Sequence, residues 1–174
     1  NLSFSATVIK SSKKHTNIFF DVHMMVNNTD HLFKDMKRAG ADLITVHYEA
    51  CKDLKSSIAN IKDLDLKAGI AISPDTDVSV LDEYLDTIDH VLVMSVHPGY
   101  GGQKFIESGY DKVLYLSKYK VQNSLEYTIS VDGGVDTRNI NKLSSLGANV
   151  LVAGSAAFKD NDTIKNIKRL HDLM

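Results

Sequence analysis

The sequence predicts an α/β fold in which repeated βα units close into a barrel, and three observations support this. Six short apolar, β-rich runs are each brief enough to be a strand buried on both faces. Stretches in which apolar residues recur every three to four positions separate these runs and indicate amphipathic helices. The unit repeat of about two dozen residues, without a large second domain, favours a closed barrel over an open doubly wound sheet.

The predicted strands are residues 18–22, 43–46, 68–72, 91–96, 127–131 and 150–153. Helical spacing is clearest at 32–39 and 140–146, and a further helix is predicted at 6–14, ahead of the first strand. Gly40 and Gly147 stand where a helix end needs a left-handed residue. Strand and helix therefore alternate along the chain.

A repeated sequence segment supports the prediction of repeated βα units. Residues 39–47 (AGADLITVH) resemble residues 146–154 (LGANVLVAG), so a helix end, a tight turn and a strand occur twice in one register. Because the predicted order opens on a helix and contains six units, we expect one domain over residues 1–174 from which the first one to two βα units of a barrel are absent.

Composition limits the classes of partner. The net charge of −2 is made up of scattered charges of both signs, which argues against a nucleic-acid partner. The longest apolar runs are too short to span a bilayer or to form a signal peptide, so we expect a cytoplasmic protein without a membrane partner. The single cysteine, Cys51, excludes an internal disulfide.

The carboxyl ends of the predicted strands carry the candidate chemistry, because working residues gather there in parallel α/β folds. His23 and Asp132 are typical metal ligands and would point toward one spot in a closed barrel. Two ligands alone do not make a site, and a hydrogen-bonded structural role is the alternative. His47 also ends a predicted strand and is interpreted as a structural histidine, and His90 is expected on a solvated helical face.

Glycine clusters at strand ends favour phosphate binding. Gly133-Gly134 and Gly154-Ser155 follow the last two strands, where backbone N–H groups commonly surround a phosphate. The loop 99–103 (GYGGQ) has the composition of a mobile lid over a substrate, with a flexible surface loop as the alternative.

Five segments in order resemble the ribulose-phosphate 3-epimerase family. They are 21–26 (DVHMMV), 39–50 (AGADLITVHYEA), 93–106 (VMSVHPGYGGQKFI), 131–135 (VDGGV) and 152–155 (VAGS). The match covers essentially the whole chain, and the ordered combination is far more specific than any one segment.

This resemblance implies a (β/α)8 TIM barrel that interconverts D-ribulose 5-phosphate and D-xylulose 5-phosphate in the pentose phosphate pathway. The family inverts C3 through an enediolate, using two aspartates as acid and base and one divalent ion held by two histidines and two aspartates. His23 matches a metal ligand at the substrate, and Asp132 matches a metal ligand that also transfers a proton. The remaining substrate-binding matches are Met25, Met94, Gly99, Tyr100, Gly101, Gly102, Gly133, Gly134, Gly154 and Ser155.

The ion can be zinc, iron, manganese or cobalt on ligand chemistry, and a homo-oligomer is expected by analogy. The family's other metal-binding histidine and aspartate belong to its first two strands, so we expect the sequence as given to be inactive alone. His97 and Tyr100 depart mildly from the family pattern in the lid. The alternatives are an allulose-6-phosphate 3-epimerase and an inactive truncated barrel.

Overall fold

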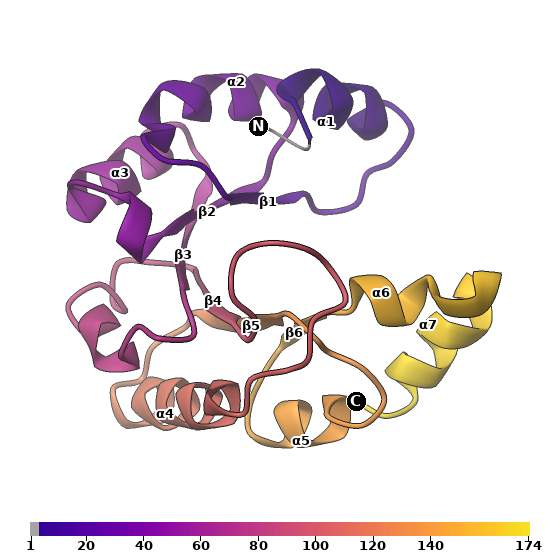
Figure 1. The fold of residues 1–174 in the computed structure, drawn as a ribbon. Helices are drawn as coiled ribbons and strands as arrows, with labels where there is room; N and C mark the ends of the chain where they lie inside the picture. The colour runs from indigo at the N-terminus through magenta and orange to yellow at the C-terminus, as the bar shows by residue number, and fades with distance from the viewer. Residues whose placement is uncertain (1–3) are drawn as a thin grey trace. The chain divides into compact units, whose positions relative to one another are not determined.

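The computed structural model describes residues 4–174, which form two compact units (Figure 1). The first unit comprises residues 4–71 and 87–90, and the second comprises residues 72–86 and 91–174. Among these described residues, no helix has both the length and the apolar character that crossing a membrane requires.

The first unit alternates helices and strands. Its elements are α1 (Ala6–Lys13), β1 (Asp21–Met24), η1 (Thr29–Leu32), α2 (Phe33–Ala39), β2 (Leu43–His47), η2 (Tyr48–Ala50), α3 (Leu54–Lys62) and β3 (Lys67–Ile72), whose last residue belongs to the second unit. The strands β1, β2 and β3 pair in parallel and in chain order, with His23 opposite Thr45 and Thr45 opposite Gly69. Helices α1 and α2 lie side by side (Figure 1).

The second unit continues the alternation. It contains η3 (Val78–Leu81), β4 (His90–Met94, whose first residue belongs to the first unit), α4 (Ser108–Gln122), β5 (Thr128–Asp132), α5 (Ile140–Ser145), β6 (Val150–Val152), α6 (Gly154–Ala157), η4 (Lys159–Asn161) and α7 (Thr163–His171). The strands follow the order β4, β5, β6, and β5 pairs with β6 in parallel, with Asp132 opposite Val152. These alternating elements confirm the predicted α/β fold.

Burial explains why the central strands could be predicted from the sequence. In β2, residues 43–46 are all buried, and in β4 the buried residues 90–93 are consecutive, as expected of strands covered on both faces. Helices contribute one apolar stripe each, such as Phe33 and Met36 of α2 and Val113 and Leu116 of α4. Gly40 and Gly147 have φ of 101° and 110°, which confirms the predicted left-handed helix ends.

Two sequence expectations need correction. The first strand was predicted at 18–22 but lies at Asp21–Met24, because Ile18 and Phe19 are exposed side chains ahead of the paired residues. His90 was expected on a solvated helical face, yet it opens β4 and is buried. Its Nε2 lies 3.7 Å from Oδ2 of Asp21 in the first unit.

Candidate functional site

His23 occupies the carboxyl half of β1, where the parallel register brings it beside the end of β2. Its Nε2 lies 2.8 Å from Nε2 of His47, and the two rings stack with centroids 4.9 Å apart. Nδ1 of His47 lies 3.3 Å from Oε2 of Glu49. A chain of three polar side chains therefore follows the ends of two neighbouring strands.

These contacts place His23 beside a histidine that itself contacts a carboxylate. Glu49 can only accept, so Nδ1 of His47 bears the shared proton, and the donor in the Nε2–Nε2 contact follows the tautomers of the two rings. Burial, with smaller contributions from His47 and His90, lowers the pKa of His23 to about 4, so the ring is neutral near pH 7.

Asp132 is the last residue of β5, and its main chain is hydrogen-bonded to Ser95, the residue that follows β4. The Ser95 N–H donates to the Asp132 carbonyl oxygen at 2.8 Å. The Ser95 hydroxyl lies 2.6 Å from the Gly133 carbonyl oxygen and 3.0 Å from that of Asp132. Burial raises the pKa of the Asp132 carboxyl, so its anionic form gains from a nearby cation.

The pair Gly133-Gly134 makes a turn that only glycine fits. The φ angles are 119° and 64°, in the region that side chains disfavour. A Cβ at Gly133 would lie 2.5 Å from a methyl carbon of Val96, and one at Gly134 would lie 2.4 Å from the backbone nitrogen of Phe105. The backbone after β5 is therefore packed against the residues that follow β4.

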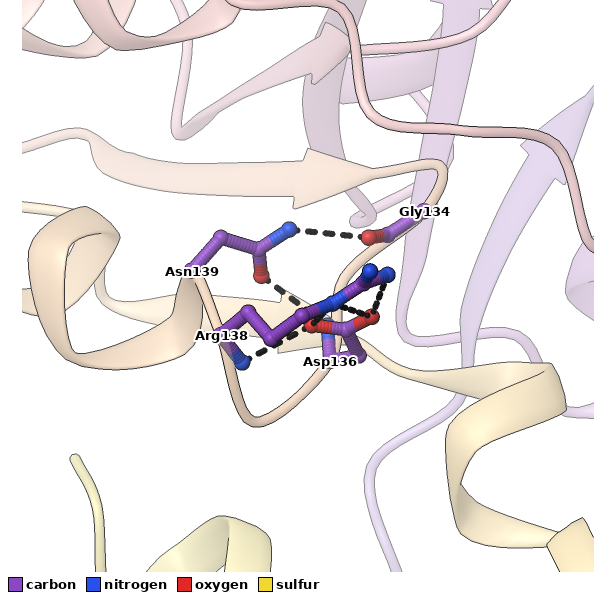
Figure 2. A network of polar contacts seen from close by, with 4 residues as sticks. All are labelled: Gly134, Asp136, Arg138 and Asn139. Carbon is purple, nitrogen blue, oxygen red and sulfur yellow. Dashed lines mark hydrogen bonds and ion pairs between the residues drawn. The ribbon is translucent and has the colours of Figure 1, made fainter.

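A polar network locks this turn (Figure 2). Buried Asn139 donates from Nδ2 to the Gly134 carbonyl oxygen at 2.9 Å and accepts the Asp136 N–H at 2.9 Å. The Asp136 carboxylate accepts the Arg138 N–H at 2.8 Å and pairs with the Arg138 guanidinium. That guanidinium holds the pKa of Asp136 below its ordinary value. The glycine turn is thus preorganised by its own loop.

The second glycine cluster opens α6 after β6. Gly154 and Ser155 are exposed, and Ser155 lines a cavity of about 640 Å³ together with Gly134. The structure therefore brings one member of each predicted phosphate-binding pair to the same cavity, and the Gly99–Gln103 loop contributes Gly102 and Gln103 to its lining.

The side chain of Gln103 forms hydrogen bonds within the loop that was predicted to be a lid. Its side-chain nitrogen donates to the carbonyl oxygens of His97 and Tyr100, at 2.8 and 3.0 Å. The Tyr100 side chain is 80% exposed, and a Cβ at Gly101 would meet nothing within 4 Å. The loop is therefore held by two hydrogen bonds from Gln103, and Tyr100 is exposed.

The two predicted methionines belong to different units. Met25 follows β1 and lines a cavity of about 430 Å³ with His23. Met94 ends β4 and is half-buried. At the neighbouring strand end of β3, buried Lys112 from α4 donates to the carbonyl oxygens of Ser73, Pro74 and Thr76 at 2.8, 2.8 and 2.6 Å.

The predicted metal ligands lie in separate units, His23 in the first and Asp132 in the second. Within residues 4–174, no three His, Cys, Asp or Glu side chains are grouped so that they could hold an ion. Each residue nevertheless has the chemistry of a ligand. His23 is neutral near pH 7, and Asp132 is a carboxylate whose charge is opposed by burial.

Sequence reasoning missed three residues that organise these strand ends. His47 was read as a structural histidine, yet it contacts His23 directly, and its place at the end of the next strand was the available signal. Ser95 and Asn139 act on main-chain carbonyls, and neither carried a distinguishing signal.

Comparison with known proteins gives close relatives along nearly the whole chain. Ribulose-5-phosphate-3-epimerase from the chloroplast of Arabidopsis thaliana is 39% identical over 170 residues. The alignment covers 97% of this chain and 60% of that protein. Ribulose-phosphate 3-epimerases of Treponema pallidum and Bacillus subtilis are 40% and 36% identical, over 91% and 98% of this chain and 72% and 79% of theirs.

Solved structures agree on the fold. A 3-hexulose-6-phosphate synthase superposes with a TM-score of 0.74 at 20% identity, covering 97% of this chain and 80% of that one. A mutant tryptophan synthase α-subunit from Pyrococcus furiosus gives 0.72 at 18% identity, covering 98% and 74%. These neighbours are TIM barrels. The model of the ribulose-phosphate 3-epimerase family matches residues 1–158, and the chain belongs to that family.

Proposed function

We propose that the protein interconverts D-ribulose 5-phosphate and D-xylulose 5-phosphate by inverting C3. The observation that carries this proposal is the arrangement after β5, where Asp132 is followed at once by a glycine turn that Ser95 and Asn139 hold rigid. Such an arrangement suits a proton-transferring carboxyl beside a phosphate-binding backbone.

The phosphate of the substrate binds the backbone of Gly133-Gly134 and Gly154-Ser155. Two features support this assignment, namely that Gly134 and Ser155 line one cavity and that the turn at Gly134 is fixed before any ligand arrives. Because the phosphate is remote from C3, its binding energy positions the reacting carbon without taking part in the chemistry.

Asp132 transfers the proton at C3. A carboxyl whose pKa is raised by burial is closer to the range in which it can both take and return a proton near neutral pH. Inversion also requires a second proton donor on the opposite face of C3, a role that we do not assign to a residue of this sequence.

His23 and Asp132 are the residues that would hold a divalent ion. When bound, such an ion stabilises negative charge that develops on the substrate oxygen next to C3. His47 contacts the His23 ring through Nε2 and stacks on it, which fixes the orientation of that ring. Met25, Met94 and the 99–102 loop, with Tyr100 at its tip, restrict water around the substrate.

The test is epimerisation of D-ribulose 5-phosphate, followed together with exchange of the C3 hydrogen for solvent deuterium. Replacing Asp132 by Asn should lower kcat by roughly 10²- to 10⁴-fold, the usual worth of a positioned proton-transfer group. Asp111→Asn, an exposed carboxylate on α4, is the matched control and should leave kcat unchanged.

Two results would contradict the proposal. One is C3 exchange in Asp132→Asn at the rate of the unmodified protein. The other is turnover of D-allulose 6-phosphate in preference to the pentose phosphate, which would reassign the substrate. Metal content measured on the same samples should fall when either His23 or Asp132 is replaced.

A further inference from the structure

The cavity that contains Gly134 and Ser155 extends well beyond a single phosphate. Its volume of about 640 Å³ lies within the range of roughly 300–1,000 Å³ that whole small-molecule ligands occupy. Beyond the glycines it is lined by residues from the loop before α4, the turn before α5 and the helix α7. A group larger than one phosphate fits there.

The lining is strongly cationic. Lys104, Arg138, Lys159 and Arg169 face a single carboxylate, Asp136. The bidentate pairing of Arg138 with Asp136 neutralises one of these cations. In the part of the chain that the structure describes, no ion pair joins the other three to a carboxylate.

Two of these three cations, Lys159 and Arg169, belong to segments that hydrogen bonds join to each other. The Asn166 side chain on α7 donates to the carbonyl oxygens of Lys159 and Ala157, at 2.6 and 3.3 Å. Arg169 lies on the same helix, three residues further on. Lys159 also contributes to the lowered pKa of Asp136, so its ammonium is within electrostatic reach of the loop that carries Gly134.

A single phosphate dianion on the glycine backbone would leave much of this charge uncompensated. We propose that the cavity is a polyphosphate site, in which one phosphate of the chain occupies the Gly134–Ser155 backbone and the next ones bind Lys104, Lys159 and Arg169. An inorganic polyphosphate and the phosphate chain of a nucleotide share this chemistry. The ligand would compete with the sugar phosphate, and only the shared glycine backbone rests on the proposed function.

The test is calorimetric titration of the full protein with orthophosphate, inorganic tripolyphosphate and ATP, in buffer without divalent ions so that chelation plays no part. Tripolyphosphate should bind at least about tenfold more tightly than orthophosphate, because added charge-assisted contacts are each worth several-fold. The double variant Lys159→Gln/Arg169→Gln should lose that gain.

A matched control separates this site from a general charge effect. Lys165→Gln/Lys168→Gln removes the same charge from exposed positions of α7 that do not line the cavity, and it should keep the gain. Thermal melting of all variants checks that they fold. Binding of ATP as tight as that of tripolyphosphate would assign the nucleotide chain as a ligand, and tight binding of tripolyphosphate alone would assign the inorganic chain.

Three results would overturn the inference: equal affinity for orthophosphate and tripolyphosphate, a gain that survives in Lys159→Gln/Arg169→Gln, or a gain lost equally in the control pair. Failure of the epimerase assay with the polyphosphate gain intact would instead refute the proposed function alone. If no phosphate compound binds, both the glycine backbone assignment and this inference fall.

Discussion

Replacing Ser95 by Ala removes a buried hydroxyl that joins the residue after β4 to the end of β5. The Ser95 side chain is fully buried, and its Oγ lies 2.6 Å from the Gly133 carbonyl oxygen. Its N–H still donates to the Asp132 carbonyl oxygen in the variant, at 2.8 Å. The change therefore leaves one buried acceptor, that of Gly133, without its donor.

The magnitude follows from that single loss. A hydroxyl has one proton, so only the shorter contact can be a full hydrogen bond, and the smaller Ala side chain clashes with nothing. A buried acceptor that loses its donor costs about 1–3 kcal/mol of the free energy of unfolding. Because Gly133 follows Asp132 and belongs to the proposed phosphate-binding backbone, we also expect kcat to fall and KM to rise.

The chain supplies a matched control in the next strand. Ser130 is likewise fully buried, but its Oγ has no hydrogen-bond partner among the described residues. Ser130→Ala deletes the same atom without breaking a hydrogen bond, so stability should stay equal or rise. Urea titrations give both values, provided that the slope m is unchanged. Equal destabilisation by the two substitutions would refute the reasoning.

Three further substitutions probe the same architecture. Gly134→Ala should destabilise by roughly 2 kcal/mol or more in urea titrations, since φ is 64° and the new Cβ would lie 2.4 Å from a backbone nitrogen, whereas Gly101→Ala should be neutral. Lys112→Met leaves three carbonyl oxygens without their shared donor and should cost about 2–4 kcal/mol by the same titration; a loss below about 1 kcal/mol would contradict this. Burial lowers the pKa of His90 from 6.5 to about 4, so the stability that neutral His90 contributes is complete above pH 6.5 and falls on acidification toward pH 4, by on the order of 1 kcal/mol per pH unit. Because the pKa of His23 is lowered to the same value, His90→Leu should reduce the slope between pH 7 and pH 5 without removing it, and an unchanged slope would count against this.

Strands could be predicted from the sequence where both of their faces are buried. Residues 68–72 carry no polar side chain and residues 43–46 carry only that of Thr45, and the structure gives β2 and β3 within one residue of the predicted bounds. At 18–22 the same apolar composition misled, because composition reports hydrophobicity while a strand is defined by pairing, and here pairing starts at Asp21. His90 was misplaced since a polar residue at the first position of a strand carries no periodic signal.

The site was readable only in part, for a related reason. His23 and Asp132 could be predicted as candidate ligands from their residue types at strand ends, and their buried surroundings are consistent with that prediction. The lid residues were recognisable from their glycines, but not the single side chain, Gln103, that ties the loop to itself. A side chain that bonds to main-chain carbonyls leaves no pattern, because every residue offers the same carbonyl.

The glycines show where this limit lies. A glycine pair after a strand signals that something must approach the backbone closely, and the positive φ angles of Gly133 and Gly134 bear this out. The sequence does not say what approaches. On one side it is this protein itself, namely Val96 and Phe105 packed against the turn, and on the other it is the cavity shared with Ser155. A Cβ at either glycine therefore adds an atom to the turn that folding and ligand binding both use, whereas a change at Ser95 or Asn139, which do not line the cavity, removes a hydrogen bond to that turn without adding an atom to it.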